Sequence, residues 1–194
     1  MRAFIGIPLS DEVRCSIAAA CEAFRIAAPP WRDDKWVPAE NLHVTLKFLG
    51  DIPQEDVEPL RLALAEACRG IEPFDLELAS LKAVPNHRHA TMLWVHGTEH
   101  GEVAVQCAEL GEAIDRSLEP LGFETEQRAF KAHVTLCRTR RPRRVHAEAL
   151  QVAGEVLAAR PDSMSVRSVT LFKSTLGQGS PVYEPVAEAS LGSD

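Results

Sequence analysis

The sequence predicts an α+β fold of two similar lobes packed together, and three observations support this prediction. A length of 194 residues suits one domain, or two small lobes that share a core. The predicted elements mix strands and helices in both halves of the chain. Their order is strand-helix-strand-helix-strand-strand and then helix-strand-helix-strand-strand. The tetrapeptide His-Val-Thr-Leu occurs twice, at residues 43–46 and 133–136, and each copy follows a helix-like segment. We therefore expect the two copies to be central strands of the fold.

The first half of the chain begins with an apolar strand at Arg2–Pro8. Ser10 can N-cap the helix that follows. Two acids in its first turn suit the helix dipole, and Pro29-Pro30 ends the helix at about Ala27. A loop at 31–41 leads to the first tetrapeptide. The further expected elements are the tetrapeptide strand at 41–50, a helix from Pro53 to Gly70, a strand at 74–81, a turn at Pro85-Asn86 and a strand at 91–95.

The second half begins with a helix at 101–121, which has an apolar stripe and is closed by Gly122. The second tetrapeptide strand is expected at 129–138, followed by a loop rich in Arg and Pro. A helix at 145–159 then precedes two strands, at 165–171 and 181–186, joined across a Gly-Gln-Gly turn. Residues 189–194 are expected to fray.

The duplicated tetrapeptide carries the chemistry. In a strand, successive side chains alternate, so His and Thr face one side while Val and Leu face the other. Two such strands side by side would place His43, Thr45, His133 and Thr135 around one small space. Two imidazoles suit a phosphodiester, since one takes a proton from the attacking oxygen while the other gives one to the leaving oxygen. The hydroxyls would hold the non-bridging oxygens. A single His-x-Thr is ordinary strand sequence, but its duplication favours a catalytic pair.

The charges are unevenly distributed. A formal net charge of −7 argues against general nucleic-acid binding. Residues 131–146, however, contain six Lys and Arg residues and no acid: Lys131, Arg138, Arg140, Arg141, Arg143 and Arg144. Such a run is often a solvated loop. Its position directly after the second tetrapeptide favours a rim that attracts phosphate.

Cysteine usage and hydropathy indicate a cytoplasmic protein. The five cysteines are scattered and form no Cys-x-x-Cys pair, which predicts buried free thiols in a reducing compartment. Cys137 follows Thr135 by two residues, so we expect it on the same strand face, at the border of the site. No apolar run has the length of a membrane span, and the N-terminus lacks the pattern of a signal peptide.

Two segments of the chain resemble the motifs of a known protein family. Residues 41–50 (NLHVTLKFLG) and 130–138 (FKAHVTLCR) are similar to the motifs of the two-histidine (2H) phosphoesterase superfamily. Within it, the chain resembles the bacterial RNA 2′,3′-cyclic phosphodiesterases, also called the 2′-5′ RNA ligase family. The likeness extends to residues 1–8, 36–37, 171–176 and 183–185. The family often has Pro before the second His, where this chain has Ala132, a change of backbone stiffness that leaves the chemistry intact.

The resemblance implies a single bilobal domain over residues 1–194, with antiparallel sheets facing a central cleft and helices outside. It also implies an enzyme that hydrolyses RNA 2′,3′-cyclic phosphate ends to 2′-phosphate, with ATP-independent 2′-5′ RNA ligation as the reverse type of reaction. The expected substrates are RNA with such ends or cyclic nucleotides, and no cofactor or metal is expected. The family's paired residues correspond to His43, Thr45, His133 and Thr135, with Arg138 as a phosphate contact. We further expect a monomer that does not bind membranes.

The sequence also suggests which histidine is the acid. Lys131 and Arg138 flank His133, whereas only Lys47 is near His43. Cations disfavour a second positive charge nearby, so we expect His133 to be the general base and His43 the general acid.

Two other classes of function remain open at this point. One is a nucleotide- or RNA-binding module with the same fold and no turnover, although both histidines are intact. The other is a metallohydrolase that uses His87, His89, His96 or His100, although no acid cluster accompanies the His87-x-His89 pair. ATP-driven ligation has no support, because the chain lacks a phosphate-binding Gly-x-x-x-x-Gly-Lys-[Ser/Thr] loop.

Overall fold

The computed structural model describes residues 1–97, 100–126, 130–177 and 179–192. Its helices are α1 (Asp11–Ala27), α2 (Val57–Cys68), α3 (Glu102–Leu118) and α4 (Ala147–Ala158). Its strands are β1 (Arg2–Pro8), β2 (Lys35–Trp36), β3 (His43–Asp51), β4 (Phe74–Glu77), β5 (Ser80–Val84), β6 (Ala90–His96), β7 (His133–Arg143), β8 (Ser163–Val166), β9 (Ser168–Thr175) and β10 (Val182–Ser190). Within these ranges, no helix is both long and apolar enough to cross a membrane.

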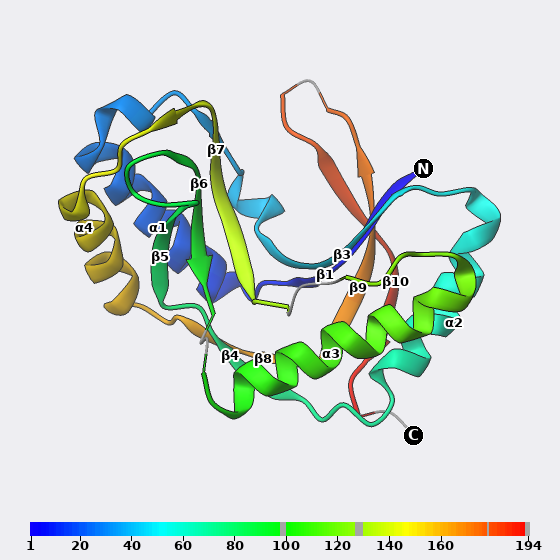
Figure 1. Ribbon diagram of the computed structural model, residues 1–194. Helices are drawn as coiled ribbons and strands as arrows, with labels where there is room; N and C mark the ends of the chain where they lie inside the picture. Colours follow the sequence, from blue (N-terminus) through cyan, green and yellow to red (C-terminus); the bar gives the residue numbers. More distant parts are fainter. Residues whose placement is uncertain (98–99, 127–129, 178, 193–194) are drawn as a thin grey trace.

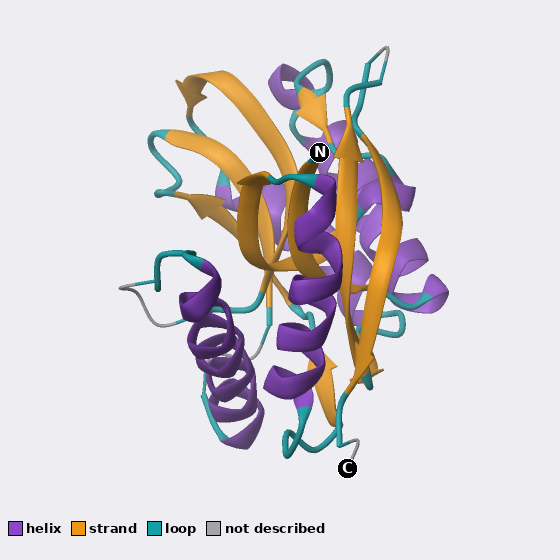
Figure 2. Ribbon diagram, turned by 90° about the vertical axis from the view of Figure 1, so that its right-hand side faces the viewer, coloured by secondary structure: helices purple, strands orange, loops and turns teal. Residues whose placement is uncertain are grey.

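An antiparallel sheet in the order β10-β9-β1-β3-β7-β6-β5 organises the molecule, with β2 paired to β7. Its two central strands, β3 and β7, carry the two tetrapeptides, and in the described residues they pair at one position, Val44 with Val134. This narrow junction divides the sheet into two lobes. Helices α2 and α3 pack together beside β9 and β10, while α1 and α4 pack together beside β5 (Figure 1). Seen from the side, helices lie in front of and behind the strands (Figure 2). The predicted α+β class with two lobes is confirmed.

Each lobe draws on both halves of the chain. Strands β1 and β3, from the start, join β9 and β10, from the end, whereas β5, β6 and β7 come from the middle. Helix α1 follows β1 in sequence but packs against α4 in the other lobe. Ser10 caps α1 as predicted, since its hydroxyl accepts a hydrogen bond from Val13 N at 3.3 Å.

Two predicted strands are each two strands in the structure. The expected strand at 74–81 divides into β4 and β5, and the expected strand at 165–171 is covered by β8 and β9. In both cases the first piece leaves the main sheet, because β4 and β8 pair with each other as a separate two-stranded sheet. Local alternation indicates an extended backbone but not the strand with which it pairs, so the sequence could not reveal the division.

The predicted ends of three elements are also wrong. The loop rich in Arg and Pro is a continuation of β7 as far as Arg143, and the expected loop at 31–41 contains β2. The C-terminus is ordered further than expected, because β10 continues to Ser190 and Leu191 is buried. Leu191 N also donates to Arg167 O at 2.8 Å, which ties this end to the start of β9. Residues 129, 178, 193 and 194, on which parts of these predictions fall, lie outside the described residues.

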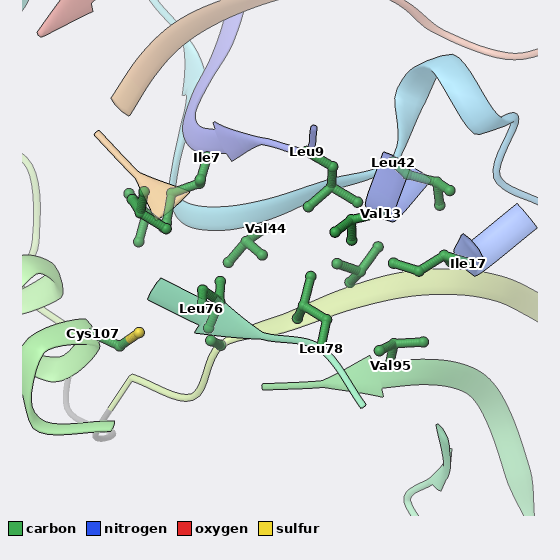
Figure 3. Close-up of a cluster of buried hydrophobic side chains, with 14 of the residues drawn as sticks. Ile7, Leu9, Val13, Ile17, Leu42, Val44, Leu76, Leu78, Val95 and Cys107 are labelled. Carbon is green, nitrogen blue, oxygen red and sulfur yellow. The ribbon is translucent and has the colours of Figure 1, made fainter. Parts of the chain in front are cut away.

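The apolar half of each tetrapeptide enters the core. Val44, Val134 and Leu136 have no exposed surface, and Leu46 is 8% exposed. Figure 3 shows Val44 among Ile7 and Leu9 on one side and Leu76, Leu78 and Val95 on the other. Burial of each such side chain contributes about 1.5–3 kcal/mol. The core therefore anchors the two strands on one face and leaves their other face for His and Thr.

Candidate active site

The register of β3 and β7 brings the four predicted side chains to one face of the sheet. Because the strands are antiparallel and Val44 is opposite Val134, His43 lies beside Thr135, and Thr45 lies beside His133. The two histidines are diagonal neighbours across the junction, a relation that separates backbone positions by roughly 7–8 Å in a regular ladder. The arrangement is close to two-fold symmetric, as the duplicated sequence suggested.

Both strands carry a β-bulge at the leucine of the tetrapeptide. On β3, Thr45 is opposite Gly6 but Lys47 is opposite Ile5, so Leu46 is an extra residue. On β7, Thr135 is opposite Trp94 but Cys137 is opposite Leu93, so Leu136 is the extra residue. Each bulge reverses the alternation of the residues that follow it.

The bulge corrects the expectation for Cys137. This thiol points away from the histidines and is completely buried, and burial raises its pKa to about 12. Arg138 takes the place on the histidine face instead and is exposed, opposite Met92. On β3, Lys47 is likewise buried on the far side, where it forms an ion pair with Asp115 of α3, and Phe48 is 68% exposed on the histidine face. The five cysteines are free, but Cys15 is exposed and Cys21 only partly buried, contrary to the expectation of buried thiols.

The backbone fixes the tautomer of both imidazoles in the same way. Nδ1 of His43 lies 2.7 Å from the carbonyl oxygen of Asn41, and Nδ1 of His133 lies 2.9 Å from that of Lys131. A carbonyl can only accept, so both Nδ1 atoms carry hydrogen and donate. In the neutral ring Nε2 is then the free base, directed toward the shared face. The hydroxyl of Thr45 lies 2.9 Å from Nε2 of His43 and donates to it in this state.

The pKa values of both imidazoles are lowered from the usual value for histidine. Burial is the main cause for each ring, and the hydrogen bond to the backbone carbonyl opposes it. The positive charge of Arg138 further lowers the pKa of His133, and a charge on His133 lowers the pKa of His43. The effect of Arg138 has the predicted direction. The charge of Lys47, by contrast, is neutralised by Asp115 on the opposite face, so the flanking cations act on His133 and not on His43.

The charge of Arg138 acts on side chains of both lobes. Arg138 comes from β7, where its Nη1 is 3.2 Å from the sulfur of Met92, yet its charge also lowers the pKa of Tyr183 on β10, against the larger effect of burial. A guanidinium in this position can interact with an anion that contacts both histidines.

An aromatic lining surrounds the imidazoles and could not be recognised from the sequence. Phe4 lies 4.6 Å from the ring of His43, and Tyr183 meets the same ring edge-on at 5.3 Å. On the other lobe, Trp94 stacks on His133 at 4.0 Å. These residues come from β1, β10 and β6 and meet only through sheet pairing, so no local motif marks them. Phe48 and Phe172 extend the lining beside Phe4.

Comparison with known proteins shows the family of this chain. The sequence matches the family model described as LigT like Phosphoesterase over residues 7–94 and 100–183. The chain belongs to this family. It is 28% identical to the RNA 2′,3′-cyclic phosphodiesterase of Methanothermobacter thermautotrophicus, over 94% of this chain and 95% of the relative. Identity to the protein of the same description from Aeropyrum pernix is 31%, over 82% of this chain and 87% of the relative. The crystal structure of TT0787 of Thermus thermophilus superimposes with a TM-score of 0.76 at 25% identity, covering 99% of this chain and 98% of that one.

The remaining histidines of this LigT-like phosphoesterase do not gather into a metal site. His87 and His89 lie in the exposed turn after β5, where Asn86 Oδ1 accepts from His89 N at 3.1 Å. His96 is buried on β6, opposite His133, and His100 borders a cavity of about 490 Å³ between α3 and residues 130–132. In the described ranges, no three His, Cys, Asp or Glu side chains are close enough to hold a metal ion.

The 490 Å³ cavity is not the site of the paired histidines. Its lining includes Phe130, Lys131 and Ala132, whose backbone leads into β7, but its other wall is α3, on the helix side of the sheet. We place the candidate active site on the face formed by His43, Thr45, His133, Thr135 and Arg138, because that face combines two oriented bases with anion-binding groups.

Proposed function

We propose that this LigT-like phosphoesterase hydrolyses RNA ends that carry a 2′,3′-cyclic phosphate and leaves a 2′-phosphate, with residues 1–194 acting as one bilobal domain. The observation that carries the proposal is the pair of imidazoles on one face, each with Nδ1 hydrogen-bonded to a backbone carbonyl, which leaves Nε2 as the atom that can exchange a proton with a ligand. The relatives described as RNA 2′,3′-cyclic phosphodiesterases support the same substrate class.

The chemistry is an in-line displacement at phosphorus. The Nε2 of one neutral histidine removes a proton from water as its oxygen attacks the phosphorus atom. The bond from phosphorus to the ribose 3′ oxygen breaks, and the other histidine, protonated at Nε2, delivers its proton to that oxygen. The product carries the phosphate on the 2′ oxygen, and the two histidines have exchanged protonation states. The carbonyls of Asn41 and Lys131 stay bonded to Nδ1 throughout, which keeps both rings oriented.

The phosphate is held by the groups beside the histidines. The hydroxyls of Thr45 and Thr135 share the face of the rings and can donate to the non-bridging oxygens, whose charge grows in the transition state. Arg138 supplies a forked donor and a positive charge from the edge of the site. Thr45 already bonds to Nε2 of His43 at 2.9 Å, so a phosphate oxygen that replaces this contact lies within reach of both groups.

We assign His133 as the base and His43 as the acid. The charge of Arg138 favours the neutral form of His133, as the base requires. The pKa of His43 is also lowered, but by burial and by the charge of His133. A dianionic transition state at phosphorus offsets both effects for the acid, because it attracts a proton to His43.

We also propose that the reaction proceeds without a metal or other cofactor, since the groups of the chain itself can move both protons. With a 5′-hydroxyl in place of water, the same displacement would bond the 5′ oxygen to phosphorus as the bond to the ribose 3′ oxygen breaks, an ATP-independent 2′-5′ ligation. Because one chain supplies both histidines, the site needs no second copy, and we expect a monomer that acts on RNA in the cytoplasm without binding membranes.

A short RNA with a 2′,3′-cyclic phosphate end tests the proposal. We expect conversion to the 2′-phosphate, identified by phosphorus NMR or by mass spectrometry after phosphatase mapping, at an equal rate with and without a strong chelator. Loss of activity in the chelator would favour the metallohydrolase. Tight binding without conversion by the native chain would instead favour the non-catalytic RNA-binding module.

A further inference from the structure

The outer end of β7, with the residue that follows it, forms a basic edge that the proposed reaction does not use. Three arginines make up this basic edge, which begins beside Arg138 of the candidate site, and all are exposed: Arg140, Arg141 and Arg144. Lys35 flanks it on β2, opposite Arg138, and Arg88 flanks it in the turn between β5 and β6. At roughly 3.4 Å per residue, the segment from Arg138 to Arg144 extends up to roughly 20 Å from the candidate site.

A large irregularity in β7 exposes the middle of the basic edge. Arg138 is opposite Met92 and Arg143 is opposite Ala90, so residues 139–142 of β7 stand opposite a single residue of β6. The hydroxyl of Thr139 stabilises this bend, because it accepts from Arg141 N at 3.3 Å and donates to Arg141 O at 3.0 Å. Arg140 and Arg141 are therefore held away from the ladder, with their side chains in solvent.

Arg143 is separated from the other arginines by its contacts. It forms an ion pair of 3.0 Å with Asp34, whose side chain is only 9% exposed, and its Nη1 also donates to the carbonyl of Pro30. Its charge is thus already neutralised, and it ties β7 to the segment before β2. Arg140, Arg141 and Arg144 form no ion pair among the described residues, so their charges remain available to a ligand.

The occupant must be a polyanion that continues from the site. A 2′,3′-cyclic phosphate is the 3′ end of an RNA strand, so the rest of that strand leaves through the 5′ oxygen of the terminal ribose. A membrane surface fits less well, because it would require exposed apolar side chains among the cations. The large exposed apolar residues in the described ranges, which include Phe48, Leu176 and Val182, all lie outside residues 138–144.

We infer that the basic edge of β7 binds the phosphates of the RNA strand upstream of the terminal nucleotide, so that the preferred substrate is an oligonucleotide and not a cyclic mononucleotide. This inference rests on the proposed function for the position of the 3′ end. It gives a role to arginines that take part in no step of the displacement itself.

The test compares two substrates in the variant R140Q/R141Q/R144Q. We expect kcat/KM to fall for an RNA of about ten nucleotides with a cyclic end, a length within the site sizes known for single strands. Hydrolysis of a 2′,3′-cyclic mononucleotide should be unchanged. Binding of a ten-nucleotide RNA with a 2′-phosphate, followed by fluorescence anisotropy, should lose salt dependence, since each single-strand phosphate contact contributes about 0.7 to the slope of log K against log salt. Three lost contacts reduce this slope by about 2. The ratio of native to variant affinity for the RNA should therefore shrink about 100-fold between about 0.1 and 1 M salt.

A control variant removes the same charge elsewhere. R61Q/R69Q/R116Q neutralises three exposed arginines, on α2, directly after α2 and on α3, each paired with a glutamate three or four residues before it. We expect this variant to keep the native slope of log K against log salt for RNA binding to within a few tenths. Circular dichroism melts of both variants verify that each is folded.

Several outcomes would overturn the inference. The first is an equal loss of kcat/KM on both substrates in R140Q/R141Q/R144Q. The second is an unchanged slope of log K against log salt in that variant, and the third is an equal effect of the control variant on RNA binding. If R140Q/R141Q/R144Q no longer sediments with anionic vesicles but still binds RNA as the native chain does, the edge binds a membrane instead. If the native chain hydrolyses neither substrate but its RNA binding responds as expected, the proposed function fails while the basic edge stands.

Discussion

The bulge in β3 predicts opposite consequences for two adjacent residues, Lys47 and Phe48. With the bulge at Leu46, Lys47 faces the helices and Phe48 faces the candidate site. In a regular strand the two faces would be exchanged. Lys47 would then contact the phosphate, and Phe48 would belong to the core. The variants K47M and F48A distinguish these arrangements.

The variant K47M should lose stability but not activity. Lys47 is 6% exposed and its partner Asp115 is 16% exposed, so removal of the ammonium leaves a largely buried carboxylate without its cation. Breaking one side of such a pair costs about 3–5 kcal/mol. Asp115 keeps a hydrogen bond from Glu126 N at 3.0 Å, which favours the lower value. About 3 kcal/mol lowers Tm by roughly 6–12 °C in a chain of this size. The double variant K47M/D115N, which leaves no unpaired charge, should recover most of this loss.

The variant F48A should lose activity but not stability. The ring is 68% exposed, and substitutions at such positions usually change stability by less than about 0.5 kcal/mol. Phe48 lies beside Phe4 on the histidine face, where it can stack on a base of the RNA. Loss of one such contact costs about 1–3 kcal/mol, or roughly 5- to 150-fold in kcat/KM. Thermal melts and kcat/KM on an oligonucleotide with a cyclic end measure both effects. If K47M abolishes activity while F48A melts more than 10 °C lower, roughly the effect of an aromatic deletion in the core, the bulge assignment is wrong.

Further predictions concern the five residues of the site. H43A and H133A should each lower kcat on the order of 10²–10⁴-fold. The double variant should be little worse than the worse single one, because one histidine alone cannot complete both proton transfers. Near-native turnover by either single variant contradicts the mechanism. T45V, T135V and R138A should lower turnover with little change in Tm, and a sharp fall in Tm would show that they are structural. The pH profile of kcat/KM should be bell-shaped with its maximum below about 6.5, since burial lowers both imidazole pKa values and the acid loses its proton as the pH rises past its lowered pKa. In R138A the pKa of His133 should rise, which moves the acid limb of the profile upward if His133 is the base and the alkaline limb if it is the acid. A nitrophenyl phosphodiester, whose leaving group needs no proton, should partly rescue H43A but not H133A; the reverse pattern would exchange the two roles.

The sequence alone determined the fold class and the candidate residues of the site. A tetrapeptide that recurs with alternating polar and apolar residues specifies two strands, each with its own buried face and reactive face, because strand alternation is a local property. The core residues of both copies are buried as expected, and the four polar side chains lie on one face as expected. Helix positions and the Ser10 cap were also readable, since propensity, capping and periodicity depend on residues within a few positions of one another.

Only the tertiary structure decided what lies around these side chains. The bulges at Leu46 and Leu136, which bury Lys47 and Cys137 and expose Phe48 and Arg138, result from the register with β1 and β6. That register is set by residues about 40 positions away along the chain. Three other features have the same origin: the aromatic lining, the ion pair that sets Arg143 apart from the other arginines, and the packing of α1 against α4 in the other lobe. Each depends on which distant strands pair, and pairing is chosen by the packing of the whole core, so no short stretch of sequence contains it.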